Sequence, residues 1–485
     1  MGLSSESVYQ LPQLSIPTSV ELFRQRARAA RPGADLPADA VEEVCRHLDG
    51  LPLAVELAAA RVRVLSVAEI ARGLEDRFGR LRGGPRDAPE RHQTLHAVVD
   101  WSWNLLDPAG RAAMRALSVF PGGFTADAAR RVLGDGDTPD VPEVLGVLEH
   151  LVDQSLLQVA DTPTGTRFRM LETVREFATG ERETAGETDR AVGGFLAWAR
   201  DFGVAHNDAL FGPDPAPPLE RMRAEHDNLA QALRYGLARA DAGTVAATSA
   251  ALGALWIIDS NYPRLMAMAS ETAYLLSHFR PGPDLLEVTR TALTLYTTYT
   301  FLLEGPRAVR SLVALRRLPP APPDTLTRAA VVVLGIVPED RSALYELCDS
   351  DEPLVAGAAN AVVSYFWESG GDLDKALKAA RRTLEAFEQR ELPYLQVIAH
   401  ARISELCLQV GEEGATRSGA RMVALAERFR FLRNFQPTMS AARARHSAEQ
   451  ADRPAYEDAV SSYAGLGHED LRAAALAALA ARECA

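Results

Sequence analysis

Helical periodicity runs through almost the whole chain and constrains its fold more than any other feature. Apolar residues recur at helical spacing in segment after segment, as in LHAVVDWSWNLL at residues 95–106. Two short β-like runs lie at Leu156–Val159 and Phe168–Met170, and the loop between them contains the turn residues Pro163 and Gly165. The pattern therefore predicts a mainly α protein with one small β-hairpin.

The length of the chain allows several cores. Its 485 residues correspond to about three domains at roughly 150 residues each. Proline-rich stretches at 211–218 and 318–324 separate helical blocks. We predict four parts, namely a helical subdomain (1–85), a winged-helix domain (86–180), a helical domain (181–325) and tetratricopeptide-like helical repeats (326–485).

The last part contains an internal repetition. The segments GDLDKALKAARRTLEAF and GEEGATRSGARMVALAERF begin at Gly371 and Gly411, forty residues apart. Each starts with glycine and an acidic residue, continues with small residues at helical spacing and ends in an aromatic residue. This period indicates antiparallel helix pairs, for which residues 353–370 and 392–411 would supply the partner helices.

Composition argues against several classes of protein. A net charge of −13 and a pI near 5.4 do not favour binding to nucleic acid or to an anionic membrane. The most apolar run, 245–258, is too short to span a bilayer and is expected to be a core helix. The first ten residues do not resemble a signal peptide. The four cysteines form no Cys-x-x-Cys pair, which fits a reducing cytoplasm.

A glycine and a proline punctuate the helices at GLPLA, residues 50–54. Gly50 is well placed to close the helix of residues 37–48 in the left-handed conformation. Pro52 suits the first turn of the next helix, where its missing N–H costs nothing. The free N–H groups there could face an anion, but a plain helix-to-helix corner is the interpretation that the residues alone favour.

Helices followed by a hairpin are typical of a winged helix-turn-helix. Its candidate recognition helix is residues 125–133, where Arg130 and Arg131 could contact DNA or a partner. Residues 91–180 contain twelve acidic and eight basic residues, however. Because DNA readers present a basic face to phosphate, we do not expect this chain to bind nucleic acid through the winged helix.

Several ordered blocks resemble a known family. The segment LDGLPLAVELAAARVRVLSVAEIARGLEDRF (48–78) resembles the helical subdomain that follows the nucleotide-binding core of NB-ARC-type signal-transduction (STAND) ATPases. It is most similar to actinobacterial regulators of antibiotic biosynthesis and their LuxR-like relatives. The resemblance continues through 91–125, 151–159, 168–178 and 220–237.

The resemblance implies a switch. In this family the proline of GLPL sits beside the adenine of ADP, the winged helix closes over the nucleotide, and the repeats sense a protein or small effector. By resemblance, Pro52 would contact the base, and Gly50, Leu51 and Leu53 would shape the joint. Nothing in the sequence indicates membrane binding.

Two departures limit what the resemblance implies. A phosphate-binding loop needs Gly-x-x-x-x-Gly-Lys-Ser/Thr, and neither lysine of the chain, Lys375 or Lys378, lies in a glycine-rich loop. We therefore expect no enzyme activity and no cofactor in this chain, with ATP or ADP bound only if a nucleotide-binding core is supplied. Whether that core is deleted, lost or omitted by a mis-started gene stays open.

The second departure lies at the end of the wing. Many members of the family carry Met-His-Asp there, with the histidine near the β-phosphate, whereas this chain has Met170, Leu171 and Glu172. Leucine cannot donate a hydrogen bond to phosphate. Nucleotide sensing through this position is therefore not expected.

Three further groups of residues could form sites. His92, His96 and Asp100 share a helix face at i, i+4 spacing, but a half-exposed stripe is a better interpretation than a zinc site. The run Glu225–Asp227 fits packing better than acid–base chemistry, because adjacent helix residues point to different faces. One of Trp101 and Trp103 is expected in the core and the other at a contact surface.

Two functional hypotheses follow. The first is a non-catalytic regulatory and sensor module of a STAND-type signalling or transcriptional regulator of secondary metabolism. It would act through winged-helix closure and through binding of a protein or small effector to the helical repeats. The alternative is a DNA-binding transcriptional regulator that uses the winged helix directly.

Overall fold

The structure, a computed structural model, is organised in two compact units. It describes residues 14–48, 50–81, 99–100, 102–134, 141–207, 209–211, 216–259, 261–304, 309–336, 341–390, 392, 395–396, 399–400, 402–403, 406–407, 421, 423–425, 428, 441–466, 470–471, 473–474 and 477. The units are Met1–Trp198 and Ala199–Ala485. Each is described by itself, and the four parts predicted from the sequence remain a finer division.

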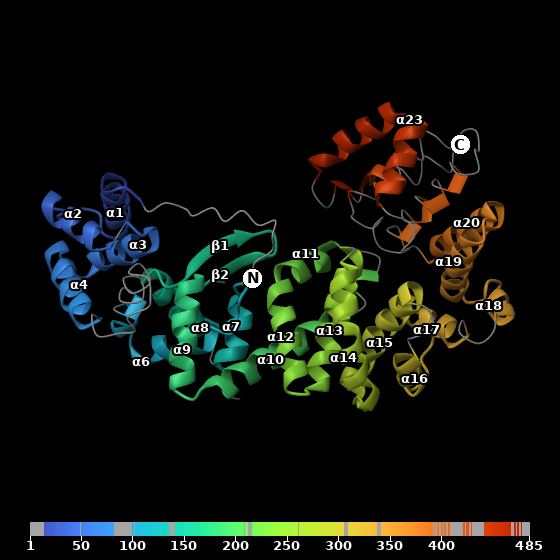
Figure 1. Cartoon of the computed structure of the whole chain (residues 1–485), viewed down its shortest axis with the longest axis horizontal. Helices are drawn as coiled ribbons and strands as arrows, with labels where there is room; N and C mark the ends of the chain where they lie inside the picture. The colour runs from blue at the N-terminus through green and yellow to red at the C-terminus, as the bar shows by residue number, and fades with distance from the viewer. Residues whose placement is uncertain are drawn as a thin grey trace. The chain divides into compact units, whose positions relative to one another are not determined.

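In its described residues, the first unit is mainly α with one hairpin, as predicted (Figure 1). A helical subdomain precedes the winged helix, and both lie within this unit. The elements are α1 (Ile16–Ala30), α2 (Ala38–His47), α3 (Pro52–Ala60), the 3-10 turn η1 (Arg61–Arg63), α4 (Val67–Leu81), α6 (Pro108–Leu117), α7 (Ala126–Leu133), α8 (Val141–Asp153), β1 (Gln158–Thr162), β2 (Gly165–Arg169), α9 (Glu172–Thr184) and α10 (Thr188–Ala205).

The corner between α2 and α3 has the geometry expected from the sequence. Gly50 has a φ of +63° and Pro52 is the first residue of α3. A Cβ on Gly50 would lie 2.3 Å from the carbonyl oxygen of Leu14. The Gly50 carbonyl in turn accepts a 2.9 Å hydrogen bond from the Leu14 N–H. Glycine is required here by both its backbone conformation and the close approach of the chain before α1.

The two strands of the hairpin extend further into the predicted loop than expected, with β1 ending at Thr162 and β2 beginning at Gly165. Gln158 pairs with Arg169 and Thr162 with Gly165, so that most of the expected loop forms antiparallel strands. Leu156 and Leu157 are buried and belong to the core beyond α8 rather than to a strand. The prediction was wrong at the strand edges because β1 is largely polar and exposed, which leaves no apolar alternation to mark it.

Aromatic side chains fill the core of the winged helix. Phe120 lies edge-on to Phe195 and Trp198, with ring centroids 5.1 Å and 5.2 Å apart. Phe124 stacks on Phe168 at 6.1 Å, and the same two residues exchange main-chain hydrogen bonds of 2.8 Å. This bridge joins the segment before α7 to β2, so one pair of residues fixes the wing against the helices.

The second unit consists of helices in the residues that the structure describes. Many consecutive helices pack as neighbours, which suits a helical array. Its elements are η2 (Ala209–Phe211), α11 (Ala216–Ala224), α12 (His226–Ala238), α13 (Ala242–Ile258), α14 (Tyr262–His278), α15 (Pro283–Glu304), α16 (Val309–Arg316), α17 (Leu326–Ile336), α18 (Arg341–Leu347), α19 (Pro353–Ser369), α20 (Leu373–Gln389) and α23 (Ala441–Ala464).

Helix α13 is the buried centre of this array, as its composition predicted. Every residue from Gly243 to Ile258 is buried, and the helix packs against α11, α12, α14 and α15. A helix that is apolar on all sides must be covered on all sides. Across the described parts of the chain, none of the helices combines the length and the apolar character needed to cross a membrane.

The first copy of the internal repetition forms a helix pair. Helices α19 and α20 are joined by Gly370, Gly371 and Asp372, and the Asp372 carboxylate caps α20 by accepting from the Lys375 N–H at 3.1 Å. A Cβ on Gly357 would meet Ala386 at 3.0 Å, so the two helices pack closely. The start of the second copy, residues 411–420, lies outside the described residues.

We expect the Gly50→Ala variant to destabilise the helical subdomain. The left-handed conformation costs an alanine about 1–2 kcal/mol, and the main chain at Leu14 would also have to move. Gly33→Ala is the matched control, because Gly33 has a φ of +88° but open space around its Cβ position. Hydrogen exchange of α2 and α3 should rise more in the first variant than in the second. An equal rise in hydrogen exchange in the two variants would contradict the close approach between Gly50 and the main chain at Leu14.

We also expect a pH-dependent contribution from the ion pair between α6 and the start of α10. Arg115 donates two 2.8 Å hydrogen bonds to the Glu187 carboxylate, which lowers the pKa of Glu187. A lowered folded-state pKa stabilises the fold above the ordinary glutamate range, and the gain is lost as pH falls through that lowered pKa.

Glu187→Gln should therefore quicken amide exchange in α6 at pH 7 by roughly 5–30-fold, equivalent to 1–2 kcal/mol. The difference from the unmodified chain should shrink on acidification once the intrinsic pH dependence of exchange is removed. Glu183→Gln, at an exposed position of α9, should have little effect at any pH. If the difference in exchange rate between Glu187→Gln and the unmodified chain does not change with pH, the stabilisation does not come from the ionised carboxylate of Glu187.

Candidate functional site

The structure places the GLPL residues at a solvent-facing corner of the helical subdomain. Pro52 is exposed at the first turn of α3, while Gly50 is buried against the chain that precedes α1. Leu51 is half-buried, and the side chain of Leu53 lies outside what the structure describes. The corner is therefore formed as predicted, with Pro52 open to a partner, and its contact with a nucleotide remains a prediction.

The triplet at the end of the wing has structural roles. Met170 is buried, and Leu171 adopts an extended conformation as the residue before α9. Glu172 is the first residue of α9, where the helix dipole stabilises a negatively charged carboxylate. It also pairs with Arg175. This pairing lowers the pKa of Glu172. All three residues thus contribute to the turn from the wing into α9.

The predicted recognition helix is not the helix next to the wing. Arg130 and Arg131 lie on α7, whereas α8 directly precedes the β-hairpin and is the second helix of the α7–α8 pair. In a helix-turn-helix the second helix is the one presented to the major groove. Residues 125–133 therefore do not form the helix next to the wing, and the contact of Arg130 and Arg131 with DNA or a partner remains a prediction.

The outward side of α8 does not suit contact with DNA. No lysine or arginine occurs in α8, and Glu149 and Asp153 are exposed on it. Leu145 is also exposed, at 36%. On α7, Arg130 lies 3.9 Å from the Asp127 carboxylate. Phosphate contacts dominate the affinity of DNA-binding proteins. Because α8 is acidic and partly apolar and occupies the position of the helix that enters the major groove (the reading position), its surface opposes the binding of DNA.

The end of α8 contacts the helical subdomain instead. Arg61 in η1 is only 1% exposed, and its guanidinium donates to the side-chain oxygen of Gln154 and, at 3.5 Å, to the Gln154 carbonyl. Burial lowers the pKa of Arg61 to about 10, so the group stays charged at neutral pH. Arg63 adds a 2.6 Å ion pair to Asp153 at the surface.

The other candidate residues have structural partners or lie outside the description. His92, His96 and Trp101 belong to the latter group. Trp103 is the core tryptophan, 5% exposed and edge-on to Phe177 at 5.6 Å. Among the residues that the structure describes, no cluster of three His, Cys, Asp or Glu side chains could hold a metal ion.

The run Glu225–Asp227 ties α12 to α13. Glu225 is buried and accepts a 2.6 Å hydrogen bond from the Asn228 amide. The Nε2 atom of His226 accepts from the Trp256 N–H at 3.2 Å, and its Nδ1 lies 2.9 Å from the Asp227 carboxylate. This arrangement agrees with packing rather than with acid–base chemistry.

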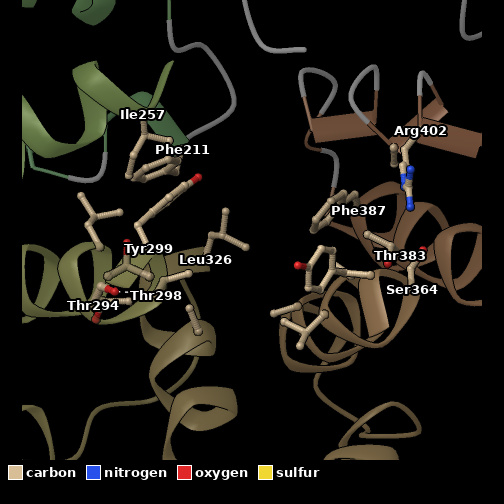
Figure 2. A pocket seen from close by; sticks show the side chains of 18 of the residues that line it. Phe211, Ile257, Thr294, Thr298, Tyr299, Leu326, Ser364, Thr383, Phe387 and Arg402 are labelled. Atoms are coloured by element: carbon tan, nitrogen blue, oxygen red, sulfur yellow. Dashed lines mark hydrogen bonds between the residues drawn. The ribbon is translucent and has the colours of Figure 1, made fainter. Parts of the chain in front are cut away.

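The second unit contains a pocket of about 190 Å³ that the sequence did not indicate. Figure 2 shows two walls that face each other, with Phe211, Ile257 and Tyr299 on one side and Phe387 and Arg402 on the other. The lining is dominated by aromatic, aliphatic and alanine side chains. Its residues come from η2, α13, α15, α17, α19, α20 and the segment after α20, which are brought together only by the fold.

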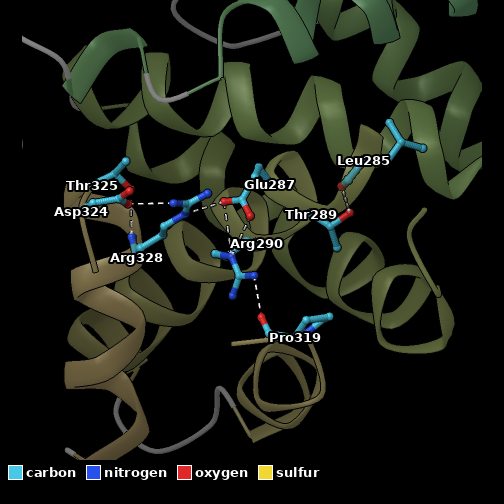
Figure 3. Close-up of polar contacts among 8 residues, drawn as sticks. All are labelled: Leu285, Glu287, Thr289, Arg290, Pro319, Asp324, Thr325 and Arg328. Carbon is cyan, nitrogen blue, oxygen red and sulfur yellow. Dashed lines mark hydrogen bonds and ion pairs between the residues drawn. The ribbon is translucent and has the colours of Figure 1, made fainter. Parts of the chain in front are cut away.

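Ion pairs fix the α15 and α17 helices that form one of these walls. Glu287 on α15 accepts from Arg290 at 3.4 Å and from Arg328 on α17 at 3.0 Å (Figure 3). Arg290 is 3% exposed and donates a 2.7 Å hydrogen bond to the Pro319 carbonyl. Arg328 also bonds Asp324 at 2.7 Å. The proline-rich joint 318–324 is thereby attached to both helices.

Comparison with known proteins identifies the domain in the first unit. Residues 106–181 match the winged helix-turn-helix domain family. A putative HTH-type transcriptional regulator of Mycobacterium tuberculosis is 42% identical over 242 residues, which are 48% of this chain and 27% of the relative. An uncharacterized protein of the same strain is 39% identical over 196 residues, 40% of this chain and 50% of the relative.

The chain thus spans about a quarter of the length of the first of these relatives and half of the second. Among solved structures, it is similar to a signal transduction ATPase with numerous domains (STAND) that has a tetratricopeptide repeat sensor, from Pyrococcus horikoshii. That likeness has a TM-score of 0.37 at 13% identity, and it covers 92% of this chain and 64% of the other.

We expect Arg61 and Gln154 to be energetically coupled. In a double-mutant cycle of Arg61→Met and Gln154→Ala, the coupling should be about 1–2 kcal/mol, because each change removes the same partly buried hydrogen bond to a charged group. Opening free energies from hydrogen exchange in α8 provide the measurement. The exposed pair Arg63 and Asp153 is the control, and its coupling should not exceed about 0.5 kcal/mol. Additive effects of the Arg61 and Gln154 changes would contradict a contact between η1 and α8.

Proposed function

We propose that this chain is a non-catalytic regulatory and sensor module of a STAND-type signalling or transcriptional regulator. In this proposal the winged helix is a protein-contact module that closes on neighbouring domains, and the helical array of the second unit binds a protein or small effector. The resemblance of the GLPL and wing segments to NB-ARC regulators of secondary metabolism motivates the family assignment. The similarity to a mycobacterial HTH-type transcriptional regulator supports a role in transcriptional regulation.

The observation that carries the proposal is the character of α8. This helix occupies the reading position of the helix-turn-helix, yet it has exposed Glu149 and Asp153 and no basic residue other than His150. Its C-terminal end is also held to η1 through Arg61 and Gln154. A helix that is acidic, partly apolar and already engaged by protein supports protein contact rather than DNA readout.

The proposed module has no catalytic role of its own. ATP or ADP would be bound by a nucleotide-binding core supplied to it, and the exposed Pro52 is available for the contact with the base that the resemblance implies. We place the module in the cytoplasm. Cys45 and Cys348 are buried, and burial raises the pKa of both thiols to about 11, so neither is a reactive nucleophile at neutral pH.

Direct DNA binding is the second candidate. The match of residues 106–181 to winged helix-turn-helix domains and the name of the relative favour it. The name does not say which part of that longer protein contacts DNA. If this chain reads DNA, the exposed Arg131 and the half-exposed Arg130 of α7 are the basic side chains nearest the reading helix in sequence.

Titration of the purified chain separates these functions. With a labelled duplex of about 30 base pairs at 50 mM salt, we expect no saturation below about 10 µM, the range of weak non-specific binding. Calorimetry with ADP and with ATP should give no binding at tens of micromolar. Submicromolar DNA binding with a steep salt slope, lost in the Arg130→Ala/Arg131→Ala variant, would establish the second candidate. Nanomolar nucleotide binding would contradict the absence of a nucleotide site.

A further inference from the structure

We propose that the pocket of the second unit binds a small neutral molecule, mostly apolar, that carries one hydrogen-bonding oxygen. This inference rests on the proposed sensor function and names the chemical class of its effector. The pocket lies within one compact unit, between helices far apart in the sequence (Figure 2). Such convergent, largely apolar cavities are the usual form of small-molecule sites in proteins.

The size of the pocket sets the size of the ligand. At about 190 Å³ it is somewhat larger than a cavity of about 150 Å³ that holds one benzene molecule. A single substituted ring therefore fits. The half-buried Ala358 and Ala361 on α19 and Ala330 on α17 leave this space because none of them has a side chain long enough to cross it.

The walls are fixed without a ligand. The shared carboxylate of Glu287 joins α15 to α17 through Arg328, and Arg290 holds the joint that precedes α17 (Figure 3). On the other side, α19 and α20 pack closely at Gly357, where a Cβ would lie 3.0 Å from Ala386. A cavity between two fixed walls binds without a large ordering cost.

The charge of the lining favours a neutral ligand. Among the described lining residues, Arg402 is the only one with a charged side chain. It donates to the Glu368 carboxylate at 2.6 Å, and both side chains are at most 10% exposed. The pair leaves no net charge at the pocket, so a carboxylate in the ligand would have to displace Glu368 or lose its hydration without compensation.

One hydroxyl in the lining is buried and has no hydrogen-bond partner among the described residues. On α15, the hydroxyl of Thr298 donates to the carbonyl four residues earlier at 2.8 Å. On the facing wall, Ser364 donates to the Ala376 carbonyl at 2.8 Å. Thr294, which is 2% exposed, has no hydrogen-bond partner for its Oγ1 among the described residues. A buried hydroxyl without a partner is costly. Because the Oγ1 atom is itself buried, the Thr294 side chain has to rotate about χ1 before this hydroxyl can donate to an oxygen of the ligand.

Three probes of similar shape test the proposal, namely toluene, p-cresol and p-toluate, titrated into the full chain by ligand-observed NMR. We expect p-cresol to bind more tightly than toluene and p-toluate to bind at least tenfold more weakly than p-cresol. Thr294→Val should weaken p-cresol about fivefold, the worth of one hydrogen bond, and leave toluene unchanged. Ala361→Phe should abolish binding of both by filling the cavity.

The matched control is Ala356→Phe, a half-buried position of the same helix that does not line the pocket, and circular dichroism checks that every variant is folded. Binding that Ala361→Phe leaves intact, no binding of p-cresol up to its solubility limit, or tighter binding of p-toluate would each overturn the proposal. These outcomes concern the pocket alone. Failure of the proposed regulatory function would appear separately, as tight DNA or nucleotide binding by the unmodified chain.

Discussion

A buried guanidinium holds the helical subdomain to the winged helix, and the arrangement of the first unit depends on it. Arg61 directly follows α3, a helix composed mostly of alanine, leucine and valine. Its charge is enclosed by protein, and Gln154 at the end of α8 supplies the oxygens that receive its N–H groups. Since a buried charge without partners is strongly unfavourable, separation of η1 from α8 would leave Arg61 unsatisfied unless water reached it.

The contact with Arg61 also bears on what α8 can bind. A helix in the reading position of a winged helix can face DNA or protein, and its fold alone does not decide which. Here the decision comes from side chains, because the exposed carboxylates of Glu149 and Asp153 oppose phosphate and the end of the helix is already bound to η1. These side chains are the basis of the proposal that the winged helix contacts protein.

In the second unit, polar contacts at the edge make an apolar pocket possible. Glu287, Arg290 and Arg328 fix α15 and α17 near their starts, and Arg402 and Glu368 neutralise each other beside the cavity. The helices are held apart at the pocket by their connections elsewhere. Small side chains at the facing positions then leave a space that packing does not fill.

Much of the fold could be predicted from local patterns. Composition placed the buried helix of residues 245–258, and the pair Gly50 and Pro52 marked the corner between α2 and α3. These features depend on backbone conformation and on which face of a helix is apolar, both of which act over a few residues. The ends of the strands were misplaced because β1 is largely polar and exposed, and the packing of α6, α7 and α8 as one set became visible only in the structure.

The features of the candidate sites also fall into two groups, those set by neighbouring residues and those formed by distant segments. The sequence by itself determined the helices, the corner at Gly50 and the lack of a basic reading surface, since each is a property of neighbouring residues or of composition. Only the tertiary structure decided that Arg61 meets Gln154, 93 residues later, and that Thr294, Ala361 and Phe387 enclose one cavity. The physical reason is that a contact or a cavity between distant segments depends on how whole helices pack, and that information is not carried by the spacing of residues within any one of them.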